Sequence, residues 1–199
     1  MLKINTLTLG LYQVNCYVVR NEDSDRCVVI DPGYDGQTVL RFLKEQDLHL
    51  EAILLTHGHF DHVGAVKELT AETDCKVFLH DLERTMPEAM TAGPLYATDN
   101  YPHRFSVAGM EFTVLHTPGH TPGSVCLICE DAMFSGDTLF ADSCGRTDLP
   151  GGDLDAILTS LRRLDALEED YDVYPGHSAS TKLSREKQYN GFIKKARAQ

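Results

Sequence analysis

The pattern of apolar and polar residues in the first 70 positions predicts strands that alternate with helices. Short runs that alternate or are rich in β-branched residues are typical of strands, whereas apolar residues three and four apart indicate a helix. Strands are predicted at residues 6–10, 15–20, 26–33 and 51–56, and helices at residues 36–46 and 61–70. The polar stretch at residues 21–25 is a turn between two of these strands.

The remainder of the chain repeats this order of elements. Strands are predicted at residues 76–80, 124–130, 132–135 and 171–174, a hairpin at 105–116, and helices at 81–86, 153–167 and 183–199. Residues 87–104 follow neither period, and a loop of this length is usually functional or mobile. Strands before helices in both halves predict an α/β (α+β) fold in which two sheets pack face to face with helices outside. The length favours a single domain over residues 1–199.

Three histidines and an aspartate occupy residues 57–62 (HGHFDH), directly after a predicted strand, in a chain with nine histidines. A lone histidine in a loop is more often structural, but here four ligand-type side chains occur together. His57 and His59 are two residues apart in an extended segment and can point the same way. Asp61 can cap the following helix, with His62 in its first turn. Imidazoles and carboxylates are ligands for ions such as zinc, so the cluster predicts a metal site.

Further ligand-type residues follow three other predicted strands. They are His116 and His120 in HTPGHTPGS, Asp137 in MFSGDTLF and His177 in DVYPGHS. A histidine or aspartate before a glycine at a strand end is more often part of a turn. Because the same arrangement recurs at several strand ends, we expect these residues to share one rim of the fold.

Composition narrows the class of protein. The formal net charge of −12 repels phosphate backbones, so nucleic acid is not an expected partner. No apolar run approaches the roughly 20 residues of a membrane span, and the beginning does not resemble a signal peptide, so we expect a cytoplasmic protein without membrane association. Cys126 and Cys129 have the spacing of a metal-binding pair, but three residues apart on a strand they face opposite sides and are interpreted as packing residues.

The order of these residues resembles the metallo-β-lactamase superfamily over nearly the whole chain. The matching elements are VIDPG around Asp31, the His-x-His-x-Asp-His segment at 57–62, and the single residues His120, Asp137 and His177. The resemblance implies a four-layer αββα sandwich with two divalent metal ions. It implies that one ion is bound by His57, His59 and His120, the other by Asp61, His62 and His177, and both by Asp137. Asp31 is then a supporting residue, and His116 falls outside the pattern.

Two such ions imply a particular chemistry. Divalent ions roughly 3.5–4 Å apart can share a water and lower its pKa from 15.7 toward about 7. A hydroxide between them would attack an electrophilic carbonyl or phosphorus, and Asp61 and Asp137 would be catalytic as well as metal-binding. We expect zinc, with iron and manganese as alternatives, because imidazole and carboxylate ligands accept all three.

Residues 137–153 (DTLFADSCGRTDLPGGD) resemble the glyoxalase II group, the hydroxyacylglutathione hydrolases, and especially its short bacterial members. Cys144-Gly145-Arg146 matches a Cys-Gly-Lys/Arg element whose basic residue contacts glutathione. The resemblance implies hydrolysis of an S-acyl glutathione or a related thioester. For Arg146, an ordinary solvated charge is the alternative.

The chain departs from the longer glyoxalases II in two ways. Further histidines of that group are replaced by Gly58 and Phe60, and we expect no C-terminal helical domain, because the chain ends about twenty residues after His177. Between residues 182 and 197 six cations accompany a single acid. We expect Lys182 and Arg185 to join Arg146 in binding an anionic small-molecule thioester, and a solvated helix face is the alternative.

Three other functions compete with thioester hydrolysis. A persulfide dioxygenase would use similar ligands with a single iron, and a lactonase or other ester hydrolase would share the fold. A non-catalytic metal-binding protein is an alternative of a different class, which a missing ligand would favour. The oligomeric state does not follow from the sequence.

Overall fold

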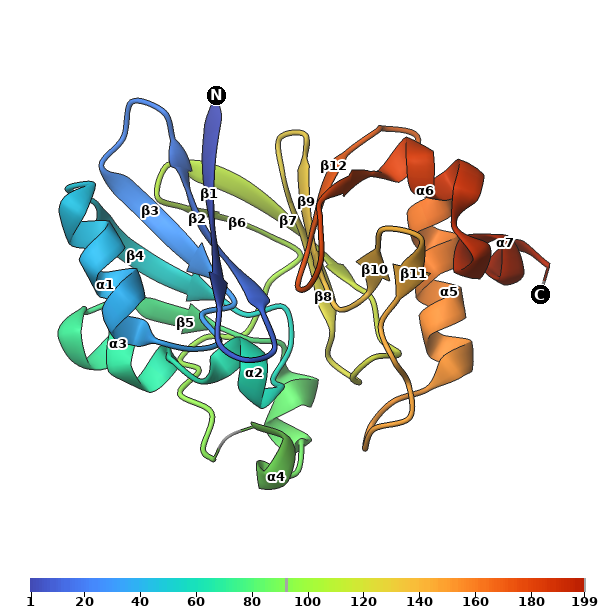
Figure 1. Cartoon of the computed structure of the whole chain (residues 1–199), viewed down its shortest axis with the longest axis horizontal. Coiled ribbons are helices and arrows are strands. Elements are labelled where there is room, and N and C mark those ends of the chain that lie inside the picture. Colours follow the sequence, from blue (N-terminus) through green and yellow to red (C-terminus); the bar gives the residue numbers. More distant parts are fainter. Residues whose placement is uncertain (92, 199) are drawn as a thin grey trace.

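The computed structural model describes residues 1–91 and 93–198, and two β-sheets pack face to face at its centre (Figure 1). The N-terminal sheet has the strand order β1-β2-β3-β4-β5. Its strands are β1 (Leu2–Leu9), β2 (Val14–Asn21), β3 (Arg26–Ile30), β4 (His49–Leu54) and β5 (Lys76–Phe78). The first three are antiparallel, and β3, β4 and β5 are parallel, with α1 (Gly36–Glu45) between β3 and β4.

The C-terminal sheet has the order β13-β12-β9-β8-β7-β6. Its strands are β6 (Arg104–Val107), β7 (Met110–His116), β8 (Val125–Cys129), β9 (Ala132–Gly136), β12 (Asp172–Pro175) and β13 (Thr181–Lys182). Strands β6 to β9 are antiparallel neighbours, whereas β12 runs parallel to β9. The carboxyl ends of β9 and β12 therefore lie at the same edge of the fold.

Helices cover the outer face of each sheet. In Figure 1, α1 and α3 (Val66–Glu72) lie outside the N-terminal sheet, and α5 (Leu154–Asp165), α6 (Leu183–Tyr189) and α7 (Gly191–Arg197) lie outside the C-terminal sheet. Alternation along β2 shows how the layers are built, because Cys16 and Val18 pack under the helices while Tyr17 and Val19 face the other sheet. The predicted four-layer αββα sandwich is confirmed.

The helix predicted at residues 61–70 is wrong in one respect. The structure has two separate helices, the single turn α2 (Phe60–Val63) and α3, and Asp61 lies inside α2 instead of capping it. The break follows from a tertiary contact: Ala65 donates to the Pro32 carbonyl, and a Cβ on Gly64 would lie 2.3 Å from the Gly33 carbonyl oxygen. This contact keeps the ligand-bearing segment against the β3 end.

Four further elements differ from the predictions. The expected C-terminal helix is divided at Asn190, whose side chain caps α7 by accepting from the amides of Phe192 and Ile193. A small hairpin of β10 (Leu139–Phe140) and β11 (Ser143–Cys144) follows β9. The helix predicted at residues 81–86 is a 3-10 helix at Asp81–Thr85. The loop predicted at residues 87–104 contains one helical turn, α4 (Glu88–Thr91).

Cys126 and Cys129 are confirmed as packing residues. Cys126 belongs to the core under α5 and Cys129 to the core between the sheets, so their thiols face opposite sides of β8. Burial raises the pKa of these thiols to about 11 and about 12, respectively. Among the described residues, no helix is both long and apolar enough to cross a bilayer.

Candidate metal centre

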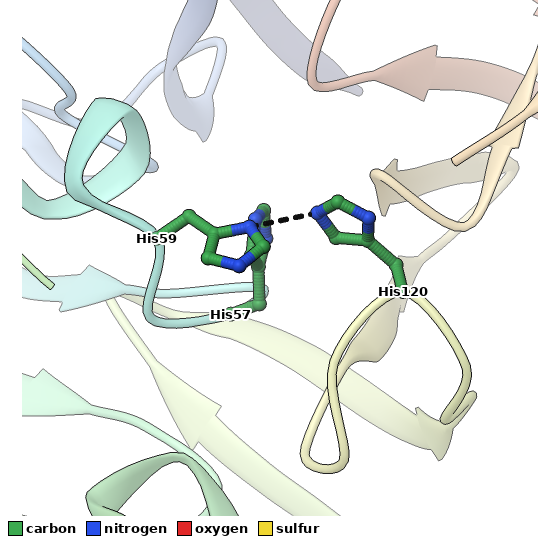
Figure 2. A group of neighbouring side chains, drawn as sticks. All are labelled: His57, His59 and His120. Carbon is green, nitrogen blue, oxygen red and sulfur yellow. Dashed lines mark hydrogen bonds between the residues drawn. The ribbon is translucent and has the colours of Figure 1, made fainter. Parts of the chain in front are cut away.

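The predicted metal ligands lie together at one end of the sandwich. They follow four strand ends: residues 57–62 come after β4, His120 lies between β7 and β8, Asp137 follows β9 and His177 follows β12. The amide of Val125 donates to the Thr56 carbonyl at 2.9 Å, which ties the two sheets together beside the centre. Figure 2 shows His57 and His59 on one segment and His120 facing them from the other sheet.

His57, His59 and His120 form a buried group. One ring nitrogen from each lies within 4.8 Å of the others, and Nδ1 of His59 is 2.8 Å from Nε2 of His120 (Figure 2). All three side chains are buried. Such convergence of imidazoles without an intervening acid is the donor set of a transition-metal ion.

A second group lies beside the first and is partly open to solvent. Its members are Asp61, His62 and His177, whose potential ligand atoms also lie within 4.8 Å of one another. Nε2 of His177 is 3.3 Å from Oδ2 of Asp61 and 3.4 Å from Nε2 of His62. His62 is fully buried, whereas the His177 side chain is 23% exposed and forms the accessible side of the group.

Asp137 lies between the two groups. Its Oδ1 atom is 3.5 Å from Nε2 of His62, and its Oδ2 atom is 3.6 Å from Nε2 of His120 and 3.7 Å from Nε2 of His177. One carboxylate therefore reaches both groups, as the predicted bridging ligand should.

The donor set fits two divalent cations. Nε2 of His57, Nε2 of His59 and Oδ1 of Asp137 are buried without a hydrogen-bond partner among the described residues. Buried polar atoms are nearly always paired, so atoms left without a donor indicate a missing electrophilic partner. Ions here would contact Nε2 of His57 and the Asp137 carboxylate.

Three histidines are oriented from behind by hydrogen-bond acceptors. Nδ1 of His120 lies 2.8 Å from the Arg146 carbonyl, and Nδ1 of His177 lies 3.0 Å from the Tyr12 carbonyl. Nδ1 of His62 lies 2.9 Å from a carboxylate oxygen of Asp31. The acceptors of His120 and His177 are carbonyl oxygens, so Nδ1 of these two rings carries the proton and their Nε2 atoms face the centre, free to bind a metal.

Asp31 and Thr56 link this orientation to the sheet. The Asp31 carboxylate accepts from the amide and the hydroxyl of Thr56 at 2.8 and 2.6 Å as well as from His62. The supporting position that the family resemblance implied for Asp31 thus has a physical basis.

Burial and neighbouring charges shift the pKa values of the residues in the centre. Burial, followed by repulsion from His120 and His62, lowers the pKa of His59 to about 4. Burial and neighbouring imidazoles also hold the pKa of His57 well below its usual value. Burial raises the pKa of Asp61, but the hydrogen bond from His177 and the charge of His62 prevail and lower it to about 2. For His62 burial is outweighed by the charges of Asp137 and Asp31, which raise its pKa to about 9, so a metal ion bound there would displace a proton.

A buried glutamate behind the first group was not predicted. Glu83 is fully buried, and its carboxylate accepts from the amides of Gly58 and Gly123. A glutamate in a short amphipathic segment gives no sign of burial in a single sequence. The two glycines that approach it are the only local signal.

An apolar rim beside His177 was also missed. Leu11 and Tyr12 lie in the β1–β2 turn with most of their side chains exposed, and the Tyr12 ring packs edge-on against Phe60 with centroids 5.3 Å apart. Phe140 of the β10–β11 hairpin faces His177 from another side, at 6.4 Å between centroids. A Leu-Tyr pair in a turn, where polar residues are expected, is the signal that could have found this rim.

The predicted substrate-binding cations all have acidic partners. The exposed Arg146 side chain makes two hydrogen bonds of 2.7 Å to Asp148, although its backbone carbonyl contacts His120. Lys182 pairs with Asp172 at 2.5 Å. Arg185 makes two hydrogen bonds to Asp142, and a third contact to Glu186.

Lys182 and Arg185 also border a separate hollow. Its other lining residues are Ala141, Asp172, Ser180 and Thr181. None of these residues belongs to the two ligand groups. Of the three predicted cations, only Arg146 has a backbone contact with a predicted metal ligand.

Paired sheets flanked by helices, with histidines and aspartates gathered at one end, define a metallo-hydrolase class of fold and site. A family model described as the metallo-beta-lactamase superfamily matches residues 9–177. The chain therefore belongs to the metallo-β-lactamase superfamily, whose members bind divalent metals, typically two.

Individual relatives agree with this membership. The hydroxyacylglutathione hydrolase GloC of Haemophilus influenzae is 32% identical over 209 residues, which cover 96% of this chain and 98% of that protein. The crystal structure of the BLEG-1 B3 metallo-β-lactamase has a TM-score of 0.87 and 37% identity, with 97% of this chain and 99% of that chain covered. The structure of TTHA1623 in a di-iron-bound form has a TM-score of 0.85 and 38% identity, with 95% and 100% covered.

Proposed function

We propose that this protein hydrolyses a thioester, an S-acyl (hydroxyacyl) glutathione or a related anionic thioester, at a centre that holds two divalent metal ions. The observation that carries this proposal is the position of Asp137, within 3.7 Å of ligand atoms from both groups. The similarity to GloC over the full lengths of both proteins supports the choice of substrate class. Zinc is the proposed metal, with iron and manganese as alternatives.

The two ions would supply a water of lowered pKa and positive charge for the oxyanion of a tetrahedral intermediate. The chain supplies the ligands: His57, His59 and His120 for one ion, Asp61, His62 and His177 for the other, and Asp137 for both. The Asp61 carboxylate, with its pKa near 2, stays ionised at neutral pH and can accept a hydrogen bond from the attacking water.

The chain's other residues would bind and orient the substrate. Tyr12, Phe60 and Phe140 present apolar surface beside His177, where the acyl group would lie. The thiolate leaves without being protonated first, so a general acid is not required.

We assign recognition of the substrate's carboxylates to Arg146, Lys182 and Arg185. Each cation would have to exchange its present acidic partner for the substrate. The cost of this exchange is small for Arg146 and Lys182, whose ion pairs are exposed to solvent, and larger for Arg185, which also contacts the buried Glu186. Arg146 is supported best, because its own backbone contacts His120.

The test combines metal analysis of the purified protein with a comparison of substrates. Hydrolysis of S-lactoylglutathione should exceed that of simple esters, lactones and β-lactams, and removal of the metals with a chelator should abolish it. A higher rate with a β-lactam, the substrate class in the name of BLEG-1, would contradict the proposal. Oxygen uptake with glutathione persulfide would instead favour the dioxygenase alternative.

A further inference from the structure

Glu83 joins the two loops that carry the first histidine group. It lies in the 3-10 helix Asp81–Thr85 and has no exposed surface. Its Oε2 atom accepts from the amide of Gly58 at 2.6 Å, and its Oε1 atom accepts from the amide of Gly123 at 2.7 Å. Each carboxylate oxygen therefore holds a different segment of the chain.

The two segments come from different sheets. Gly58 lies between His57 and His59, in the segment that leaves β4 of the N-terminal sheet. Gly123 is three residues after His120, in the loop between β7 and β8 of the C-terminal sheet. The first group takes two histidines from one sheet and one from the other, and Glu83 bridges this division.

Both glycines lie close to the Glu83 carboxylate. A Cβ on Gly58 would lie 3.0 Å from Oε2 of Glu83, and a Cβ on Gly123 would lie 2.7 Å from Oε1. A Cβ on Gly123 would require the carboxylate to shift, whereas a Cβ on Gly58 would be a tight contact that a smaller shift relieves.

A carboxylate suits this position because its two oxygens can each accept from one of the two amides. A buried charge is costly unless it is hydrogen-bonded, and bonds from backbone amides to a carboxylate are among the stronger ones. Two amides from two directions require two acceptor atoms on one group. Glutamine offers one acceptor and one donor, so its NH2 group would face one of the amides.

We propose that Glu83 is a positioning residue for the first metal ion: it fixes the separation of the His57–His59 segment from the His120 loop. This inference rests on the proposed metal centre. Glu83 acts through two backbone amides, whereas other acceptors orient the second group: Asp31, which also accepts from Thr56 beside His57, and the Tyr12 carbonyl. Loss of the Glu83 carboxylate should therefore weaken binding of the first ion and leave binding of the second unchanged.

The experiment isolates each ion before Glu83 is changed. His177→Ala removes a ligand of the second group, and His120→Ala removes one of the first. Zinc affinity is then measured by competition with a chromophoric chelator, with and without Glu83→Gln. In the His177→Ala background, Glu83→Gln should weaken zinc binding by about 10- to 100-fold, as is typical for residues that orient metal ligands. In the His120→Ala background the affinity should change by less than about threefold.

Glu186→Gln is the matched control for burial. Glu186 is also fully buried, and it accepts the Asp142 amide at 2.7 Å under the β10–β11 hairpin, away from the first group. Both glutamine variants should lower the melting temperature, but only Glu83→Gln should weaken binding of the first ion. Glu83→Asp, which keeps two acceptors on a shorter side chain, should give an intermediate affinity and serves if Glu83→Gln does not fold.

Three outcomes would overturn the inference: unchanged zinc affinity in Glu83→Gln, an equal loss in both backgrounds, or an equal loss in Glu186→Gln. A His177→Ala protein that binds no zinc at all would overturn the assignment of the first group as well. Absence of thioester hydrolysis with these affinities as expected would refute only the proposed substrate, because the readout is metal binding.

Discussion

Oδ1 of Asp137 lies 3.5 Å from Nε2 of His62, and this buried oxygen has no hydrogen-bond partner among the described residues. Asparagine in place of Asp137 keeps the shape but removes the negative charge that two cations would share. We expect Asp137→Asn to lose at least about 100-fold in kcat and part of its metal. Asp23→Asn, at an exposed turn, is the control. Turnover and metal content near those of the control would contradict the bridging role.

The three cations proposed to bind substrate, Arg146, Lys182 and Arg185, should affect KM more than kcat. Contacts remote from the reacting carbonyl bind substrate and transition state alike, so their loss raises KM. We expect Arg146→Ala, and the pair Lys182→Ala/Arg185→Ala, to raise KM for S-lactoylglutathione several-fold. The effect should be larger at low salt, because salt screens exposed charges.

A small neutral thioester separates recognition from structural damage in these variants. Its KM should stay close to the wild-type value if the cations bind the carboxylates of glutathione. Arg185 needs one more control, because its bidentate bond to Asp142 holds the β10–β11 hairpin. If Asp142→Asn raises KM as much as the double variant does, the effect comes from the hairpin and not from charge recognition.

Gly145 should not tolerate a side chain. A Cβ at this position would lie 1.8 Å from the carbonyl oxygen of Asp137 and 3.2 Å from Cβ of His120. Gly145→Ala must therefore displace one of the two loops, and we expect loss of metal together with loss of activity. Gly191→Ala is the control, since a Cβ there meets no atom within 4 Å. Equal metal content in the two variants would show that the loop yields without moving the ligands.

The stability of the metal-loaded protein should decrease in mild acid through His80. Burial, followed by repulsion from His116, lowers the pKa of His80, while Asp81 opposes this shift. The two rings are stacked, with centroids 4.4 Å apart. Because the folded state then binds the proton less well than the unfolded state, stability is lost as the pH falls below the unfolded pKa of about 6.5.

His80→Asn tests this dependence and preserves the local structure. The asparagine side chain can still accept from the Leu82 amide, as Nδ1 of His80 does, but it does not titrate. Between pH 7 and pH 5.5 the melting temperature of the variant should fall less than that of the wild type. An equal or steeper fall would exclude His80 as a source of the acid sensitivity.

The gathering of the candidate ligands at one end of the fold could be predicted from the sequence, because the segments that carry them follow predicted strands. Their division between two ions came from the family resemblance and stays a prediction. A strand end, a glycine and a histidine or aspartate are all local features, and parallel strands such as β9 and β12 bring their carboxyl ends together. The helix break at Gly64 was not accessible, because it depends on the Gly33 carbonyl, which is distant in sequence. Periodicity alone predicted one continuous helix there.

The ion pairs, too, could not be predicted from local sequence. A surplus of cations after residue 181 is visible in the sequence, but the acidic partners Asp142 and Asp172 come from other parts of the chain. Likewise, the burial of Glu83 depends on two loops that meet only in the folded protein. Local patterns locate side chains on elements, whereas ion pairing depends on the assembled tertiary structure.

The first histidine group takes its side chains from both sheets. Its affinity for a metal ion would therefore depend on how the two sheets pack against each other. A cation held by His57 and His59 on one side and His120 on the other would bind tightly only when the inter-sheet core is correctly packed. A ligand that binds only the state in which the sheets are packed together stabilises that state by RT ln(1 + [L]/Kd), where [L] is the concentration of free ligand. Core residues such as Phe134 and Phe112, both buried between the sheets, would thus contribute to the affinity for a metal ion without touching it. A protein with a slightly loosened core would release its metal at temperatures where its secondary structure is still intact.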